Sequence, residues 1–347
     1  MKKLQFTLAL IVASASLLSA QVVTKAVGFT TLNLQAGNNF VGLSLQPSSA
    51  FQGAITISPT DRSHVFLTGA VVANDQFNPA TISSATTVTH VIEITAAGAT
   101  QGTNTLIIDT ISSGAELVLQ DALPASVADG SSITIWKLWT IGDAFGATNQ
   151  AGLTPGTAST ADLILLPNGA GYSQYFYSSG GFTGTGWRKV GSGTANQSAV
   201  PLYYTDGVII AAKSAKSVTV TGEIKSGKTN IVLETGNNLV VNLCPVNAGG
   251  ATPSTEGRTL GNTSLYTGNA STGLTGATTA TAADQVLIWN GTGYNQYYYS
   301  TGGFSGIGWR QVGGGATDKA AVALPDGCYV ILRRGAPVSI QLAQGNF

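Results

Sequence analysis

The residues best suited to catalysis are few and scattered. The chain has two histidines, His64 and His90, and no Cys or Asp cluster stands near either at the spacing of metal ligands. No Gly-x-Ser-x-Gly turn accompanies them, so a serine triad is not indicated. Asp162 and Asp284 recur at matching places and could act as paired glycosidase carboxylates, but a carboxylate at a strand start is more typical of a cap or turn. The sequence predicts no catalytic residue, no metal site and no cofactor.

A duplicated aromatic segment is the strongest pattern in the chain. Residues 171–193 (GYSQYFYSSGGFTGTGWRKVGSG) return as residues 293–315 (GYNQYYYSTGGFSGIGWRQVGGG), with 16 of 23 positions identical. On a strand, alternate rings face opposite sides. One interpretation buries both faces in a repeated core. The other exposes one face as a platform for sugar rings or a partner protein.

The candidate ligand-binding residues come from this platform hypothesis. A Trp-Arg pair follows each aromatic strand and could place a guanidinium near an aromatic face, a contact of about 0.5–1 kcal/mol when exposed. The candidates are Tyr175, Tyr177, Trp187, Arg188, Tyr297, Tyr299, Trp309 and Arg310.

Two cysteines, Cys244 and Cys328, form a possible disulfide. Alignment of the repeats places Cys244 opposite Leu45, and alignment on the two Asp-Gly turns places Cys328 opposite Val208. The first repeat then has an apolar pair where the second has two thiols. The sequence leaves open a core disulfide or two buried thiols.

Short β-type runs separated by turn residues extend along the whole chain. Asn168-Gly169 and Asn290-Gly291 precede the aromatic strands, and Asn-Gly is the strongest short signal for a hairpin. Thr140 is a candidate N-cap for one short helical turn. Residues 51–136 have no counterpart in the second repeat. We therefore predict an all-β fold: two homologous β-sandwich or barrel-like repeats, with a small β domain inserted in the first.

Composition and the N-terminus indicate an exported protein. Charged residues are only 9% of the chain, with 16 basic and 16 acidic, and no basic patch suggests nucleic-acid binding. Lys2 and Lys3 precede an apolar run, Leu8–Leu18, that is too short to span a membrane, and Ser19-Ala20 follows. We interpret residues 1–20 as a signal peptide, and no later run suits a transmembrane helix.

Several short motifs together resemble a known family. These are Ala26-Val27-Gly28-Phe29, the run from His90 to Thr95, the run from Trp139 to Asp143, and Gly186-Trp187-Arg188, in that order. The chain resembles a family of uncharacterised exported β-rich proteins found mainly in Verrucomicrobia and their relatives. The resemblance covers most of the mature chain and implies export and a β-rich fold, with no catalytic residue.

The predicted organisation is a signal peptide (1–20), a first β repeat (21–222) with an inserted domain (51–136), and a second repeat (223–347). The predicted function is a non-catalytic structural or surface-interaction protein, extracellular or on the cell surface, with the periplasm as an alternative. Its partners would be further copies of itself or other cell-surface proteins. A carbohydrate-binding protein for polysaccharide is the alternative, and an outer-membrane β-barrel or an enzyme comes third.

We expect cleavage near Ala20, with Ala15 as the second choice. Intact-mass analysis of the secreted protein should give a chain that begins at Gln21. A secreted chain that retains Met1 would contradict the prediction.

Overall fold

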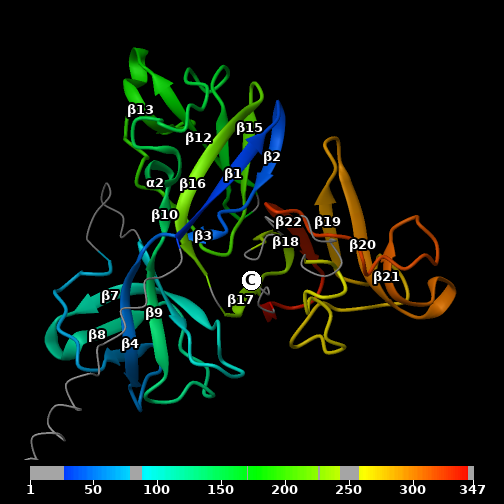
Figure 1. The fold of residues 1–347 in the computed structure, drawn as a ribbon, viewed down its shortest axis with the longest axis horizontal. Coiled ribbons are helices and arrows are strands. Elements are labelled where there is room, and N and C mark those ends of the chain that lie inside the picture. The colour runs from blue at the N-terminus through cyan, green and yellow to red at the C-terminus, as the bar shows by residue number, and fades with distance from the viewer. Residues whose placement is uncertain (1–26, 79–87, 170, 226, 243–257, 343–347) are drawn as a thin grey trace, which may run out of the picture.

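The fold is built from several antiparallel sheets and one closed six-stranded barrel (Figure 1). The computed structural model describes residues 27–78, 88–169, 171–225, 227–242 and 258–342. The prediction of an all-β protein is confirmed. No helix in these described ranges is long and apolar enough to cross a membrane.

The first lobe is a five-stranded sheet packed on a three-stranded one. In spatial order the larger sheet contains β13 (Thr185–Lys189), β12 (Tyr172–Ser179), β11 (Leu163–Pro167), β15 (Val208–Ala212) and β2 (Gly37–Val41). The smaller contains β1 (Val27–Leu34), β16 (Lys216–Ile224) and β3 (Leu45–Gln46). Ile164, Trp187 and Ile210 of the larger sheet meet Leu34 and Val220 of the smaller in one apolar core.

The second lobe contains a sheet with the corresponding strand order. It contains β21 (Ile307–Gln311), β20 (Tyr294–Thr301), β19 (Gln285–Trp289), β22 (Cys328–Arg333) and β18 (Gly236–Val241). The facing pair is β17 (Thr229–Leu233) and β23 (Val338–Leu342). Its core joins Val286, Trp309 and Ile331 of the sheet to Ile231 and Ile340 of the pair.

Short elements close one end of the first lobe. Strands β10 (Trp139–Thr140) and β14 (Pro201–Leu202) pair with each other, and the short helix α2 (Ile141–Phe145) follows β10. The Thr140 hydroxyl accepts a hydrogen bond from the Asp143 amide at 3.0 Å, so the predicted N-cap is confirmed. This cap directs Ile141 and Phe145 into the core of the lobe.

The barrel lies in sequence between β3 and β10. Around its circumference stand β4 (Ser49–Ile57), β5 (His64–Leu67), β8 (Glu116–Leu119), β7 (Asn104–Ile111), β6 (His90–Ile94) and β9 (Ser132–Lys137). A single-turn 3₁₀ helix, η1 (Ser113–Ala115), precedes β8. Alternate apolar side chains such as Ile55, Ile94 and Ile133 fill the interior. His64 and His90 each begin a strand.

The two five-stranded sheets approach very closely. Ile209, Leu239, Cys328 and Val330 form an apolar cluster between them. A Cβ atom added at Gly42 would collide with the Gly327 carbonyl oxygen, so a glycine is needed for this approach. The join also includes backbone hydrogen bonds, such as that from the Gly207 amide to the Leu239 carbonyl at 2.9 Å.

The observed register corrects the sequence alignment of Cys328. Val41 lies opposite Val208, whereas its counterpart Val240 lies opposite Tyr329. Val208 therefore corresponds to Tyr329. The second copy has one more residue than the first between its Asp-Gly turn and the strand positions that match. Cys328 is buried, and its thiol lies 3.9 Å from the Val208 carbonyl oxygen. Cys244, the other half of the possible disulfide, lies outside the described residues.

Candidate functional site

The six rings of the hypothesised platform lie mostly in the interior. Tyr177 and Tyr299 are half-buried and contact a tryptophan edge-on, at ring-centroid distances of 5.3 and 5.7 Å. The four buried rings are those of Tyr175, Trp187, Tyr297 and Trp309. These rings form the two lobe cores, as in the interpretation of a repeated core. The flat, exposed platform that the sugar-binding hypothesis requires is not formed by these rings.

Arg188 and Arg310 are buried and hold the turns that follow the aromatic strands. Arg188 donates from Nε to the Thr183 carbonyl at 2.7 Å, and from its two Nη atoms to the Trp187 and Thr185 carbonyls at 2.8 and 2.9 Å. Thr183 ends the turn, Thr185 and Trp187 lie in the following strand, and the Trp187 carbonyl also accepts from the Gln197 amide at 3.0 Å, so the guanidinium ties three carbonyl groups of one hairpin together. The two arginines are therefore structural supports of the hairpin.

The second hairpin repeats this geometry. Arg310 donates to the carbonyls of Ser305, Trp309 and Ile307 at 2.6, 2.9 and 2.7 Å, and it adds a contact to Asp318 at 3.2 Å. In both hairpins the turn is a short 3₁₀ helix, η2 (Gly181–Thr183) or η3 (Gly303–Ser305).

Each of these turns carries a phenylalanine that is almost completely exposed. Phe182 is 95% exposed and Phe304 is 99% exposed. Gly181 and Gly303, directly before them, have φ near +75°, a conformation that favours glycine and directs the next side chain outward. The hairpins β12–β13 and β20–β21 lie at separate ends of the molecule (Figure 1). Sequence reasoning missed both residues, although glycines on each side of a single Phe were a usable signal.

A second aromatic group lies where the two lobes meet. Phe40 lies 5.3 Å from Trp289 and 5.7 Å from Tyr294, measured between ring centroids. Tyr294 is 36% exposed, and Tyr172, its counterpart in the first lobe, is 43% exposed. Burial raises the pKa of both tyrosines, with smaller contributions from Cys328 to each and from Tyr172 to Tyr294. This junction cluster is a partly accessible aromatic surface shared by both lobes.

The repeated aspartates are fully occupied with structural contacts. Asp162 is buried and accepts hydrogen bonds from the Thr154 amide at 2.7 Å, from the Lys213 amide at 2.6 Å and from Lys216. Burial alone would raise the pKa of Asp162, but these donors outweigh it and lower the pKa. Asp284 accepts equivalent bonds from the Thr275 and Arg334 amides, with Arg333 as its cation at 2.5 Å.

A buried ionic cluster joins the barrel to the first lobe. Glu93 of β6 contacts Lys225 at 2.6 Å and accepts hydrogen bonds from Trp136 and Tyr204, both at 3.0 Å. Burial raises the pKa of Glu93, and these three partners offset that effect only in part. The cluster resembles an active site in its polarity, but its contacts are structural: Trp136 binds Glu93 within the barrel, and Tyr204 and Lys225 link the barrel to residues after β14.

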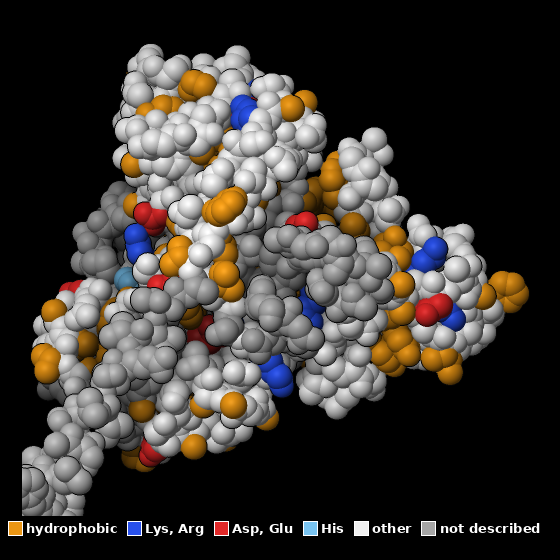
Figure 2. Space-filling view, in the orientation of Figure 1, with side chains coloured by type: hydrophobic (Ala, Val, Ile, Leu, Met, Phe, Trp, Pro, Cys, Tyr) orange, Lys and Arg blue, Asp and Glu red, His pale blue; other side chains and the backbone are white. Residues whose placement is uncertain are grey.

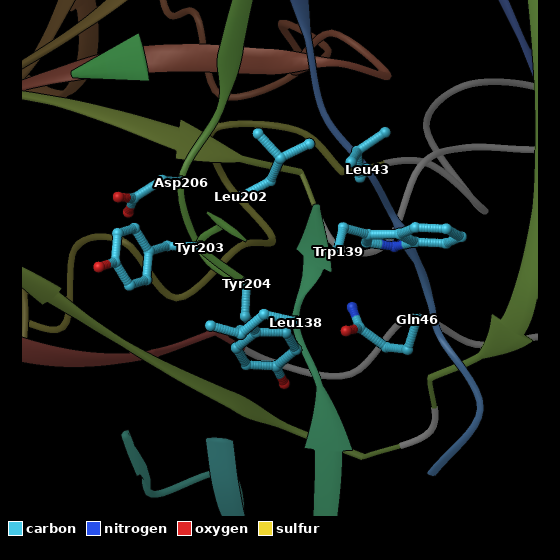
Figure 3. Close-up of a pocket in the computed structure, with 8 residues that line it drawn as sticks. All are labelled: Leu43, Gln46, Leu138, Trp139, Leu202, Tyr203, Tyr204 and Asp206. Atoms are coloured by element: carbon cyan, nitrogen blue, oxygen red, sulfur yellow. The ribbon is translucent and has the colours of Figure 1, made fainter. Parts of the chain in front are cut away.

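A small cavity near this cluster is too small for a ligand (Figure 3). Its enclosed volume is about 10 Å³, which is close to the space needed by one water molecule. The lining residues are Leu43, Gln46, Leu138, Trp139, Leu202, Tyr203, Tyr204 and Asp206. The Gln46 Nε2 group has no acceptor among the described residues, and one water would satisfy it.

Within the described ranges, no three or more His, Cys, Asp or Glu side chains gather as a metal site would require. Comparison with protein-family models, with curated proteins and with solved structures gave no match. The resemblance to the exported family therefore stays a prediction. The hairpin tips and the junction cluster are exposed or partly exposed aromatic surfaces suited to bind a partner.

Substitution of Asp162 tests whether the repeated aspartates have a structural role. We expect Asp162→Asn to lower the free energy of unfolding at pH 7 by about 2–4 kcal/mol, because it removes the buried charge partner of Lys216, whose side chain is 14% exposed. The pKa of Asp162 is lowered in the folded protein, so its contribution is present above its ordinary pKa of about 3.9 and is lost on acidification below that. The variant should therefore lose part of the wild-type acid sensitivity.

The matched control is Asp143→Asn, which breaks the exposed Lys137–Asp143 pair. A change below about 1 kcal/mol is expected there. Denaturant titrations of both variants from pH 7 to pH 3 provide the measurement. Equal effects of the two substitutions would contradict the structural role of Asp162.

Proposed function

We propose that this protein is an exported, non-catalytic structural or surface-interaction protein that binds its partners through the two hairpin tips. The observation that carries the proposal is the pair of exposed phenylalanines, Phe182 and Phe304, each on a turn fixed by a buried arginine. An exposed aromatic ring on a fixed turn loses little conformational entropy on binding. Such a ring is well suited to insert into an apolar pocket of a partner.

The repeat organisation supports the proposal of two binding elements in one molecule. The matching strand order and the similar hairpins favour two homologous repeats with the barrel inserted in the first. Two equivalent tips at separate ends would let one molecule contact two partners. Bivalent contact raises the overall affinity beyond that of either tip. Further copies of the chain and other cell-surface proteins are the proposed partners.

Low charge is the second support for a surface role. Without Lys2 and Lys3 the chain has 14 basic and 16 acidic residues among more than three hundred. Several of these are buried in structural pairs, so little long-range repulsion opposes contact between copies. The space-filling view shows few charged side chains and scattered apolar ones on this face (Figure 2). The proposed location is the cell surface or the extracellular space, with the periplasm as the alternative.

Carbohydrate binding is the second candidate function, and the junction cluster favours it. Phe40, Trp289 and Tyr294, with Tyr172 nearby in the first lobe, provide the partly exposed rings on which a sugar could stack. If this candidate is correct, a glycan array should show binding that is abolished by Trp289→Ala and unchanged by Phe304→Ala. Absence of glycan binding by the wild-type protein would contradict it.

The tips are tested by Phe182→Ala, Phe304→Ala and the double substitution. Burial of one Phe side chain contributes about 1.5–3 kcal/mol, so each single change should weaken binding roughly ten- to hundredfold. The measurement is adsorption of the purified protein to intact cells of its source, together with sedimentation of the protein alone. Circular dichroism should show unchanged folding.

The matched control is Val71→Ala, since Val71 is an apolar residue of the barrel region that is 97% exposed. This variant should bind as the wild type does. Wild-type binding by the double Phe variant would contradict the proposed role of the tips.

A further inference from the structure

Strand β1 has an outer edge that lacks a partner in the described part of the chain. It pairs with β16 over eight residues, from Val27 opposite Glu223 to Leu34 opposite Lys216. Within the described residues no other strand pairs with β1. An edge of this kind presents backbone donors and acceptors to solvent.

The corresponding strand of the second lobe shows what such an edge can bind. There the outer edge of β17 is covered by the barrel segment 98–104. The Asn230 amide donates to the Gly102 carbonyl at 3.0 Å, and the Asn104 side chain donates to the Asn230 carbonyl at 2.8 Å. Gln341 of β23 adds a bond to the Gln101 carbonyl at 2.8 Å. The edge of β17 is thus paired within the molecule.

The register places equivalent groups on the open edge of β1. In β1, Thr31 lies opposite Thr219 of β16, just as in β17 Asn230 lies opposite Gln341 of β23. Because the Asn230 amide and carbonyl point away from β23, those of Thr31 point away from β16. Antiparallel pairing alternates along a strand, so Phe29 also directs its backbone groups outward.

The sequence of β1 has none of the usual protections of an edge. The strand Val27–Leu34 (VGFTTLNL) contains no charge and no proline, and its pairing with β16 has no bulge. Val27 and Phe29 are 70% and 74% exposed. Among the described residues, the edge therefore combines backbone groups that have no partner strand with an apolar surface.

We propose that β1 pairs with β1 of a second copy of this chain, a mode of assembly that rests on the proposed surface-interaction function. Antiparallel pairing of two identical strands creates a two-fold interface, and the strands carry no charge that would repel. Each copy contributes β3, β16 and β1, so the two small sheets become one continuous sheet. Phe29 then lies over a neighbouring strand, where aromatic cross-strand pairs add stability.

Pairing of one short strand buries less surface than stable interfaces do, whose lower limit is about 1,200 Å². The association should therefore be reversible and depend on concentration. Sedimentation equilibrium of the full mature chain should give a mass that rises from monomer toward dimer. Phe29→Lys places a charge on the edge, and Thr31→Pro removes an outward amide while the bonds to β16 remain. Both variants should need at least a tenfold higher concentration to associate.

The matched control is Val232→Lys on β17, a residue that is 62% exposed on the strand whose edge is already covered. It should associate as the wild type does. Hydrogen exchange provides the specific readout, because the amides of Phe29 and Thr31 should exchange more slowly at high concentration.

Two results would overturn the inference: a wild-type protein that stays monomeric, or β1 variants that associate as the wild type does. If Phe182→Ala and Phe304→Ala abolish association while the β1 variants do not, β1 pairing is refuted and the proposed function stands. Loss of association only in the β1 variants, with cell adsorption unaffected by the tip substitutions, would support β1 pairing and refute the role of the tips.

Discussion

Two buried guanidinium groups hold the surface features on which the functional account depends. Arg188 and Arg310 each bond three carbonyl oxygens of a glycine-rich hairpin. Hydrogen bonds from a charged donor contribute about 1.5–3 kcal/mol each. The same bonds fix the direction of the adjacent phenylalanine. Charge is scarce in this chain, and much of it serves to fix loops.

Buried ion pairs elsewhere in the protein also fix loops and join parts of the fold. Asp162 and Asp284 join loop amides to the ends of β15 and β22, and Glu93 joins the barrel to Lys225. These contacts give the repeated aspartates a complete structural role. A carboxylate with both oxygens engaged in this way is poorly placed to act on a substrate.

The barrel also makes the two lobes unequal. It covers the edge of β17 through residues 98–104, whereas the equivalent edge of β1 has no partner strand in the described part of the chain. Two lobes of similar architecture therefore present different surfaces: both have a hairpin tip, but they differ at this strand edge. This difference gives the molecule a direction in any assembly that it forms.

Much of the fold could be predicted from the sequence, because its signals are local. Asn168-Gly169 and Asn290-Gly291 separate strands that do pair as hairpins, and the Thr140 cap needs only neighbouring residues. The contact between Glu93 and Lys225 could not be predicted, since it joins residues far apart in sequence. The exposure of Phe182 was missed because hydrophobicity alone indicates burial, while its turn geometry depends on buried Arg188. The misplacement of Cys328 arose from one extra residue, which only the strand register reveals.

Hydroxyl-radical footprinting of the protein, free and in place on intact cells, tests the central claim most directly. In the free protein, Phe182 and Phe304 should be among the most readily oxidised side chains because they are almost fully exposed. If the tips bind partners, both residues should become protected on the cells, while the equally exposed Val71 stays reactive. Equal oxidation of Phe182 and Phe304 in the two states would contradict the account.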